Sequence, residues 1–394
     1  MRAERRRGGV RLAILLAALA VVAPAAGAAA APRVLGIDWA GPASRLAWFD
    51  PAAMRVLPGP TAPLAWHNGS WSFDPARTRL AVGGNGDVLR LVDTTRMRVL
   101  GDVSLAPDGD YVGGVTWLRR DRVLAFVGRT ADATLAVVDP GTRQVVRSVP
   151  LGQPVMALGR LPGALVLLLR PPDGIGPARL AVVDANGRVR SVVLDRIAVG
   201  SPLQVEENKV VKTRYAGLAV DPAGTAYVVA AEGIAQVDLR TLAVSYRTPP
   251  RALAKMLSGP FRTARWLGGG LVALAGGSYT TANRETALTP YGLRVLDVRS
   301  WTMRVLDPRA TSFAAGDGFL VTQGGRAAVG YGLDGTERFR VEGSAGWVNV
   351  SGRYAEVCAD RMLVAVLDPR TGARTPAARN GRCADLLTGR WSGF

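Results

Sequence analysis

A pattern of apolar and polar residues near the middle of the chain predicts a β-hairpin. The apolar run Leu135–Val138 ends at Asp139-Pro140-Gly141, and the alternating segment Gln144–Val149 follows. Asp, Pro and Gly favour tight turns, because Asp accepts hydrogen bonds from the nearby backbone, Pro fixes φ and Gly tolerates positive φ. Two runs of strand-forming residues on either side of such a turn are typical of a hairpin. We therefore expect two antiparallel strands here.

The same hairpin recurs along the chain. In each copy an apolar run ends at an aspartate, which precedes a polar turn and a second short strand. Aligned on that aspartate, the eight copies are Leu46–Asp50, Leu89–Asp93, Leu135–Asp139, Leu180–Asp184, Ile234–Asp238, Leu293–Asp297, Ala328–Asp334 and Leu363–Asp368. They follow one another at intervals of about 35 to 60 residues, a range that includes the repeat length of propeller blades. We call the repeats units one to eight, in chain order.

A second pair of strands precedes most hairpins, so that each unit holds four strands. The clearest pairs are Trp71–Val82 and Gly217–Val229, each with an Asp-Pro turn between two apolar runs. Four short strands per repeat predict an all-β chain that forms a single β-propeller of eight four-stranded blades, with strands A to D from the axis outwards. Seven blades are the alternative if unit one is not a true blade. A stack of β-sandwich domains also has short alternating strands, but it does not repeat one hairpin signature eight times.

One unit carries a family resemblance. Val137–Leu158, with the sequence VVDPGTRQVVRSVPLGQPVMAL, resembles the YVTN-type propeller repeat, in which a V-x-D-x-x-T-x-x-V strand pair leads to a P-x-G-x-x-P connection. Gly217–Val229 is similar both to that repeat and to the NHL repeat. The other units match loosely, and neither the Tyr-Val-Thr-Asn segment nor the Trp-Asp dipeptide of WD40 blades occurs. The resemblance implies a propeller and assigns no catalytic residue.

The two ends of the chain together predict a closed ring. Residues 34–57 supply three strands, Val34–Trp39, Arg45–Phe49 and Met54–Leu57, so that unit one lacks its innermost strand. Cys383–Thr388 has the composition of a strand, and no hairpin follows it. We expect this segment to pair with unit one, because a ring closed by strands from both ends removes the free sheet edges between its first and last units.

The N-terminal segment has the composition of a secretory signal peptide. Basic residues 1–11 precede the uncharged run Leu12–Ala23, and the small residues Ala25–Ala31 follow. The apolar run is shorter than the roughly 20 residues that a spanning helix needs, and the order of the three regions is typical of a cleaved export signal. We expect residues 1–31 to be removed and residues 32–394 to form one propeller domain without a membrane span. The mature protein is then secreted, periplasmic or attached to the cell envelope.

The chain is strongly basic, with 49 Lys and Arg against 31 Asp and Glu and a formal net charge of +18. Such an excess suits an acidic partner, for example a cell-wall polymer, an acidic polysaccharide or anionic lipid headgroups. The arginines are nevertheless scattered without a block of like charges, which favours outward-facing positions on solvated strands. Nucleic acid is disfavoured as a partner, because the protein is expected to be exported.

The only two cysteines are Cys358, in strand B of unit eight, and Cys383, in the closing segment. Export favours a disulfide between them, which would contribute roughly 3–4 kcal/mol on the chain-entropy model. Two buried free thiols are the alternative, because the sequence does not show whether the two Cβ atoms meet.

Local catalytic motifs are missing from the sequence, including a G-x-S-x-G elbow, a Walker loop and a calcium-binding loop. His67 is the only histidine, which excludes a histidine-based zinc site and a catalytic histidine cluster. The eight turn aspartates suggest a carboxylate ring, but in C–D turns we expect each of them to cap its own turn. Glu356, inside a strand of unit eight, faces either the central channel or solvent.

Four long connections distinguish units four to six: Pro171–Ala178, Arg196–Arg214, Arg247–Phe261 and Gly277–Tyr291. In a four-stranded blade the A–B and C–D turns lie on one face, and the B–C and D–A connections lie on the other. The four long connections are all of the second kind, so we expect them on one face, which we call the loop face. Long loops on a rigid scaffold often carry binding residues, although surface loops also tolerate neutral insertions at little cost.

These connections supply the candidate binding residues, which are Glu206, Glu207, Lys209, Lys212, Arg251, Lys255, Tyr279, Asn283, Arg284 and Glu285. Within them, Arg251–Ser258 has helical composition and would form a small lid. We expect an exported, non-enzymatic and monomeric propeller without a cofactor. It would bind a protein, a ligand or an envelope component, such as an acidic polymer, through the loop face over units four to six. The alternative is a propeller enzyme of lactonase-like hydrolase type, with a metal held by acidic and amide residues.

Overall fold

The chain divides into two compact parts, Met1–Pro32 and Arg33–Phe394. The structure, a computed structural model, describes residues 33–38, 44–51, 53–65, 67–84, 87–105, 112–128, 133–200, 214–230, 232–248, 261–282, 285–316, 318–324, 327–343, 347–351, 354–359, 362–368, 370–375 and 385–387. All of these lie in the second part, and the predicted signal peptide lies outside the described residues. Every described element is a β-strand, and this portion of the chain has no helix long and apolar enough to cross a membrane.

Units two to eight are seven complete blades, each with a path of four strands in chain order. Units two to four contain β5 (His67–Phe73), β6 (Arg79–Gly84), β7 (Val88–Asp93) and β8 (Arg98–Ser104); β9 (Val112–Arg119), β10 (Arg122–Val127), β11 (Thr134–Asp139) and β12 (Gln144–Pro150); and β13 (Val155–Leu161), β14 (Ala164–Leu169), β15 (Ile175–Asp184) and β16 (Val189–Gly200). Unit five contains β17 (Gly217–Asp221), β18 (Thr225–Val229), β19 (Ile234–Asp238) and β20 (Val244–Arg247).

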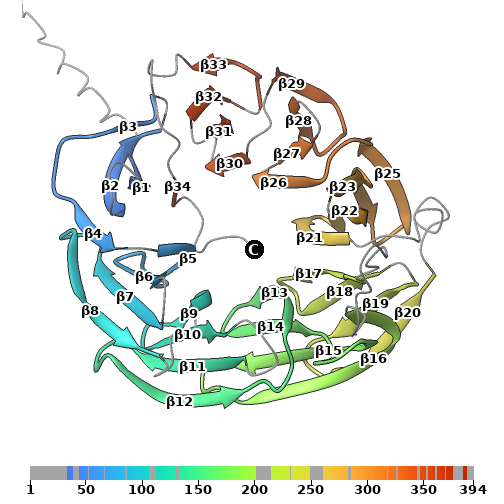
Figure 1. Cartoon of the computed structure of the whole chain (residues 1–394), viewed down its shortest axis with the longest axis horizontal. Coiled ribbons are helices and arrows are strands. Elements are labelled where there is room, and N and C mark those ends of the chain that lie inside the picture. The colour runs from blue at the N-terminus through green and yellow to red at the C-terminus, as the bar shows by residue number, and fades with distance from the viewer. Residues whose placement is uncertain are drawn as a thin grey trace, which may run out of the picture. The chain divides into compact units, whose positions relative to one another are not determined.

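Unit six contains β21 (Phe261–Gly268), β22 (Leu271–Ala282), β24 (Leu293–Asp297) and β25 (Thr302–Asp307), and an additional strand, β23 (Glu285–Pro290), pairs with β22. Unit seven contains β26 (Ser312–Gly316), β27 (Phe319–Gly324), β28 (Ala327–Gly332) and β29 (Glu337–Glu342). Unit eight contains β30 (Trp347–Ser351), β31 (Tyr354–Ala359), β32 (Met362–Leu367) and β33 (Arg374–Thr375). Figure 1 shows these sheets following one another round a ring, with the first strand of each unit nearest the axis.

Unit one is built differently, so the expectation of eight four-stranded blades is wrong. Its sheet has two full-length strands, β1 (Val34–Asp38) and β2 (Ser44–Asp50), and three short ones, β3 (Arg55–Val56), β4 (Ala62–Ala65) and β34 (Asp385–Leu386). The number of complete four-stranded blades is therefore seven, and unit one is a composite sheet made from both chain ends. β3 stops early because Pro58 and Pro60 follow it, and proline lacks the N–H that a sheet ladder requires.

The predicted closure of the ring is confirmed. β34 pairs antiparallel with β1 through Gly36–Leu386 and Ile37–Asp385. Beyond this pair, the N–H of Leu387 donates to the carbonyl oxygen of Leu35 at 2.8 Å, and Leu387 is fully buried. The last residues that the structure describes thus form the inner strand that the N-terminal segment lacks.

The turn aspartates cap their turns, as predicted. At the end of strand C in every unit, an aspartate Oδ1 accepts a hydrogen bond from a backbone N–H two or three residues later. The pairs are Asp50 with Ala53, Asp93 with Thr95, Asp139 with Gly141, Asp184 with Asn186, Asp238 with Arg240, Asp297 with Arg299, Asp334 with Thr336 and Asp368 with Arg370. Hydrogen bonds to an ionised carboxylate are stronger than neutral ones, so these aspartates stabilise the hairpins.

Five of these turns end on a residue other than glycine with positive φ, four positions after the aspartate. These residues are Met54 (50°), Met97 (50°), Arg143 (60°), Leu242 (62°) and Trp301 (56°). The sequence did not indicate them, because the left-handed region usually selects glycine. Met54 and Met97 are buried, which indicates that packing of the side chain offsets the backbone cost.

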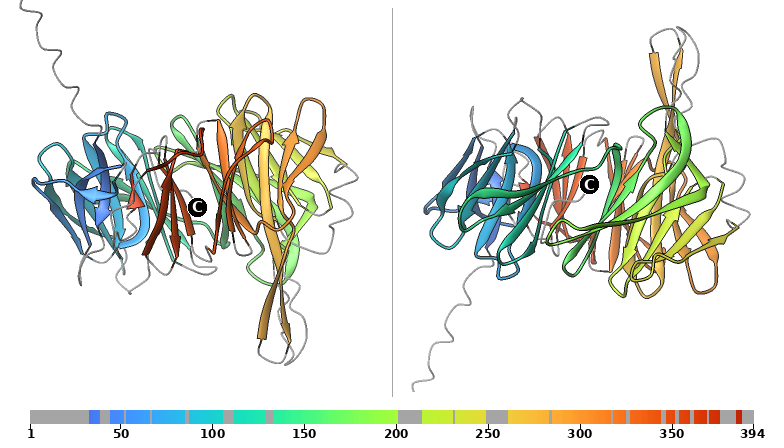
Figure 2. Two further views of the ribbon diagram at one scale, coloured as in Figure 1. Left: turned by 90° about the horizontal axis from the view of Figure 1, so that it is seen from above. Right: turned by 90° about the horizontal axis from the view of Figure 1, so that it is seen from below.

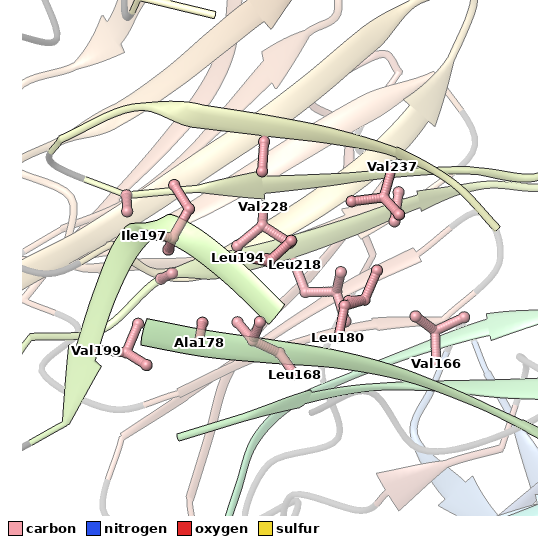
Figure 3. Packing of buried hydrophobic residues seen from close by; sticks show 14 of the residues in the cluster. Val166, Leu168, Ala178, Leu180, Leu194, Ile197, Val199, Leu218, Val228 and Val237 are labelled. Carbon is pink, nitrogen blue, oxygen red and sulfur yellow. The ribbon is translucent and has the colours of Figure 1, made fainter. Parts of the chain in front are cut away.

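The hydrophobic core is divided among the seams between neighbouring units. Between units four and five, for example, Leu168, Leu180 and Leu194 pack against Leu218 and Val228 (Figure 3). Each sheet therefore buries both faces, which explains why strands such as β14 (ALVLLL) are apolar almost throughout.

Arginines on the outer strands connect neighbouring units. Arg190 Nη1, on β16 of unit four, donates to the carbonyl oxygen of Arg240 in the C–D turn of unit five at 2.8 Å. Arg304 and Arg338 reach the C–D turns of the next units in the same way, with bonds of 2.7 Å to the carbonyl oxygens of Asp334 and Arg370. The planar guanidinium offers several N–H donors at the end of a long side chain. Part of the arginine excess thus holds the outer edges of the blades together.

Candidate functional site

The strand order places the four long connections on the loop face, as predicted. They join β14 to β15, β16 to β17, β20 to β21, and β22 to β24. The structure corrects the nature of three of them, because much of their described length is strand. β15 already begins at Ile175, β16 continues to Gly200, and β22 and β23 together account for most of the last connection. These described residues extend the sheets of units four and six, whereas residues 201–213 and 249–260 lie outside the described part of the chain.

Most of the candidate binding residues lie outside the described part of the chain. This applies to Glu206, Glu207, Lys209, Lys212, Arg251, Lys255, Asn283 and Arg284, and also to the predicted lid. Tyr279 lies in β22 and Glu285 begins β23, so both belong to one hairpin. Whether these ten residues bind a ligand stays a prediction.

The β22–β23 hairpin is the most prominent feature of the loop face. The first half of β22 pairs with β21 and β24 inside unit six, and its second half, Gly277–Ala282, pairs only with β23. Figure 2 shows this two-stranded ribbon standing clear of the ring on one side. Its register places Tyr279 opposite Leu288 and Ala282 opposite Glu285. Both long edges of the ribbon lack a strand partner among the described residues.

Unit four also extends on this side, through a widened pairing of β15 with β16. Pro177 pairs with Ala198 and Ala178 with Leu194, so Asp195, Arg196 and Ile197 form a bulge between the two pairs. Ile197 is fully buried in the seam with unit five. A bulge bends and twists a strand, and here it leads the end of β16 across the neighbouring unit. In the sequence, this bulge is indicated by the broken alternation of the apolar residues Leu194, Ile197 and Val199.

Polar side chains of the bulge attach it to unit five. The hydroxyl of Tyr246, on β20, donates to Asp195 Oδ1 at 2.5 Å, and the guanidinium of Arg196 lies 5.1 Å from the centre of the Tyr246 ring. Burial and the adjacent carboxylate raise the pKa of Tyr246. The hydroxyl therefore stays protonated at neutral pH and acts as a donor that fixes the bulge.

Gly200, at the end of β16, and Arg214 lie side by side. Gly200 and Arg214 exchange two backbone hydrogen bonds of 2.9 and 2.8 Å, and Arg214 Nη1 forms an ion pair with Glu232 at 2.5 Å. Glu232 lies in the B–C connection of unit five. The residues on either side of 201–213 are thus held together at the edge of unit five, and Glu206, Glu207, Lys209 and Lys212 lie in the sequence between them.

A buried polar cluster lies at the seam between units six and seven, close to the base of the hairpin. The hydroxyl of Thr322 donates to Asp307 Oδ2 at 2.9 Å, and both residues are buried. Burial, together with the nearby charges of Asp307 and Glu337, raises the pKa of Tyr331 to about 12. The sequence alone does not reveal this cluster, because its members lie on different strands and form no local motif. The hydrogen bond of this cluster joins unit six to unit seven, so the cluster holds the two units together at their seam.

Groups with catalytic potential do not converge among the described residues. No three His, Cys, Asp or Glu side chains gather there in a way that could hold a metal ion. Glu356 is buried in β31, which excludes the solvent-facing one of its two alternatives. His67 lies at the start of β5. Cys358 is disulfide-bonded, and the only other cysteine, Cys383, lies outside the described residues.

Among the described residues of the innermost strands, Arg160 is a deeply placed cation that no local sequence motif indicates. Arg160, on β13, donates from Nε to the Thr116 hydroxyl at 2.8 Å and from Nη2 to the Val115 carbonyl oxygen at 3.0 Å. The residue as a whole is half-buried, whereas its guanidinium is enclosed, and burial lowers the pKa of Arg160 to about 9. The group still carries its charge at neutral pH and connects the inner strands of units three and four.

Comparison with known proteins supports the β-propeller fold and identifies no family for the chain. Neither a protein-family model nor a curated protein sequence matches the chain. Among solved structures, the dihydro-heme d1 dehydrogenase NirN in complex with DHE is similar with a TM-score of 0.59 at 14% identity, over 91% of this chain and 74% of that one. The computationally designed protein Ika8 is similar with a TM-score of 0.52 at 11% identity, over 90% and 96%. The chain is a β-propeller with repeated blades, and the resemblance to YVTN-type repeats stays a prediction.

Proposed function

We propose that this chain is an exported, non-enzymatic β-propeller that binds a protein or another envelope component through the loop face over units four to six. The observation that carries the proposal is the β22–β23 hairpin, which continues for six paired positions beyond the sheet of unit six. A two-stranded ribbon is at best marginally stable by itself in water. A partner that covers the ribbon would stabilise it, and unpaired strand edges are available for such contacts.

The seam of units four and five, beneath part of this surface, is closely packed, which suits a binding scaffold. The seam of units four and five is fully apolar in its centre and is secured at its rim by the Asp195–Tyr246 hydrogen bond and the Arg214–Glu232 ion pair. Loops that project from a packed framework lose less conformational entropy on binding than loops on a flexible one. Residues 201–213, which connect Gly200 and Arg214 beside this seam, would therefore be presented from a packed base.

The register of the strands provides a clean test. The Tyr291 N–H donates to the Gly276 carbonyl oxygen, and Gly200 and Arg214 exchange two backbone hydrogen bonds, so either pair can be joined by an Asn-Gly turn without a change of register. In one variant this turn replaces Gly277–Pro290, and in the other it replaces residues 201–213. Each variant and the unaltered mature protein are used to capture material from the envelope fraction of the source cells.

We expect both variants to melt as the unaltered protein does and to lose captured material, because the ring is retained and only the projections are removed. A further variant keeps the full hairpin and carries Tyr279→Ser and Leu288→Thr. It separates the contribution of these two side chains to binding from that of the ribbon backbone. If the melting temperature and the captured material are both unchanged in the two shortened variants, the binding surface is not on the loop face.

Export forms a separate part of the proposal. It is supported by the basic, apolar and small-residue regions of residues 1–31. N-terminal sequencing of the protein purified from its own cells should find a chain that begins between residues 29 and 32. A chain that still begins at Met1 would reject cleavage.

A further inference from the structure

Several exposed arginines lie where units two and three meet, on the face opposite the loop face. This face carries the A–B and C–D turns, and we call it the turn face. The A–B turns of units two and three hold Arg77 and Arg120, and Arg119 ends the strand before the second of them. The A–B turns of units four, five and six, at residues 162–163, 222–224 and 269–270, contain no basic residue. Among the described A–B turns, arginines thus occur in units two and three, whereas Arg353, between β30 and β31, lies outside the described residues.

Contacts on the turn face join these turns into one surface. Arg79 Nη2 donates to the carbonyl oxygen of Arg120 at 2.6 Å, which connects the A–B turns of units two and three. Arg143 Nη1, in the C–D turn of unit three, donates to the carbonyl oxygen of Leu100 on β8 at 2.8 Å. Within unit two, the Thr94 hydroxyl donates to the carbonyl oxygen of Arg77 at 3.0 Å, which connects the C–D turn to the A–B turn.

Five exposed arginines lie on this surface, and we call them the arginine patch: Arg96, Arg98, Arg119, Arg120 and Arg143. The side chain of Arg96 is 75% exposed, and its contact with Asp93 at 3.3 Å is a surface ion pair, a kind that contributes little. Arg119 shares Asp121 with Arg122. Among the described residues Arg98 and Arg120 have no ion-pair partner. Positive charge therefore exceeds negative charge on the patch, and its guanidinium groups are accessible.

We propose that the arginine patch binds a linear anionic polymer with regularly spaced carboxylate or phosphate groups. Guanidinium groups bind both kinds of anion through two parallel hydrogen bonds, and several of them spread over two units match a chain of charges better than a single ion. The large hydrophobic side chains that are exposed among the described residues are Val146, Ile175, Val189, Val193 and Val305. None of them lies in the turns of units two and three, which favours a soluble polymer over insertion into a membrane.

The test compares two variants of the mature protein with equal charge loss. The patch variant carries R96A, R98A, R119A and R120A, whereas Arg143 is retained because it supports β8. The control variant carries R188A, R240A, R299A and R370A, four exposed arginines from the C–D turns of units four, five, six and eight. Binding of polygalacturonate and of polyphosphate is measured by titration calorimetry at about 50 and about 200 mM salt, since phosphate contacts show a strong salt dependence.

The unaltered protein should bind at least one polymer, and the patch variant should bind it at least tenfold more weakly. The control variant should lose less than threefold, and all three proteins should melt within a few degrees of one another. The polymer that binds distinguishes carboxylate from phosphate recognition. The proposal is overturned if both variants lose equal affinity, because net charge alone would then explain binding. Anionic lipid vesicles are titrated in the same way. The proposal is also overturned if neither polymer binds, or if the protein binds the vesicles and neither polymer. The shortened loop-face variants should keep polymer binding, so the two proposals can fail independently.

Discussion

Arg77 Nη2 donates a hydrogen bond of 2.9 Å to the carbonyl oxygen of Leu387, across 310 residues of sequence. Arg77 lies in the A–B turn of unit two, and Leu387 follows the two-residue strand that completes unit one. The guanidinium also lies 4.4 Å from the centre of the Phe73 ring. One side chain thus connects the first complete blade to the C-terminal strand, next to the site of ring closure.

Deleting Arg382–Phe394 should lower the unfolding temperature and broaden the transition. Unit one would lose β34 and the fully buried Leu387, and the inner edge of β1 would be left without its partner. Thermal unfolding followed by far-ultraviolet circular dichroism measures the effect. An unchanged, equally sharp transition in the shortened chain would show that the C-terminal strand does not close the ring.

Arg77→Ala should have a smaller effect than the deletion, about 1 kcal/mol in the free energy of unfolding, because it removes one hydrogen bond from a charged donor at a partly exposed site. Arg55→Ala is the control, since Arg55 is an exposed arginine on β3, the outer strand of unit one. Urea unfolding monitored by tryptophan fluorescence should separate the two variants. Equal midpoints would contradict the role assigned to Arg77.

Acid should destabilise the propeller through its turn aspartates. The Thr95 hydroxyl and the backbone N–H of Arg96 lower the pKa of Asp93, and turn N–H groups likewise lower the pKa of Asp139, Asp238, Asp297 and Asp334. A carboxyl whose pKa is lower in the folded state than in the unfolded state stabilises the fold above its unfolded pKa, near 4. That stability is lost as the pH falls from about 4 through the folded pKa.

Asp93→Ala should cost about 1 kcal/mol at pH 7, because two backbone N–H groups lose their acceptor. It should cost much less near pH 2.5, where the wild-type carboxyl is protonated as well. Urea midpoints at both pH values test this. A cost that is equal at the two pH values would mean that the carboxylate charge does not matter in the turn.

Gly217→Ala should destabilise the ring by about 1–3 kcal/mol, the usual cost of overpacking. A Cβ atom on Gly217 would lie 2.7 Å from the Cβ of Ala264 and 3.2 Å from its backbone nitrogen, so the inner strands of units five and six would have to separate. Gly233→Ala, in the same unit, is the control, because its nearest neighbour would be 3.6 Å away. Thermal melting should shift for the first variant and stay almost constant for the second.

The disulfide of Cys358 predicts that the denatured, unreduced protein contains no reactive thiol. Cys383 is the only available partner within the chain, and the bridge should contribute roughly 3–4 kcal/mol. Labelling with a thiol reagent in denaturant gives the thiol count, and Cys358→Ser with Cys383→Ser gives the stability. Two labelled thiols in the unaltered protein would rule the bridge out.

The sequence by itself determined the features that depend on neighbouring residues. Asp139-Pro140-Gly141 specifies its turn through the bonds that Asp139 can accept two residues away, and the same chemistry located all eight C–D turns. The closing strand was also predictable, because the apolar segment after Cys383 had no hairpin of its own. Local chemistry of this kind acts within a few residues and is therefore visible in any linear pattern.

Only the tertiary structure decided what the long side chains and long connections do. The partners of Arg190 and Arg304 are carbonyl oxygens 50 and 30 residues away, which no local rule selects. The number of strands in the sheet of unit one depended on the pairing of β1 with β34 from the other end of the chain. The bulge at Asp195 depended on the seam with unit five, in which Ile197 is buried. In each case the deciding contact is made by a neighbouring unit, which stands beside the residue only after the sheets have closed into a ring.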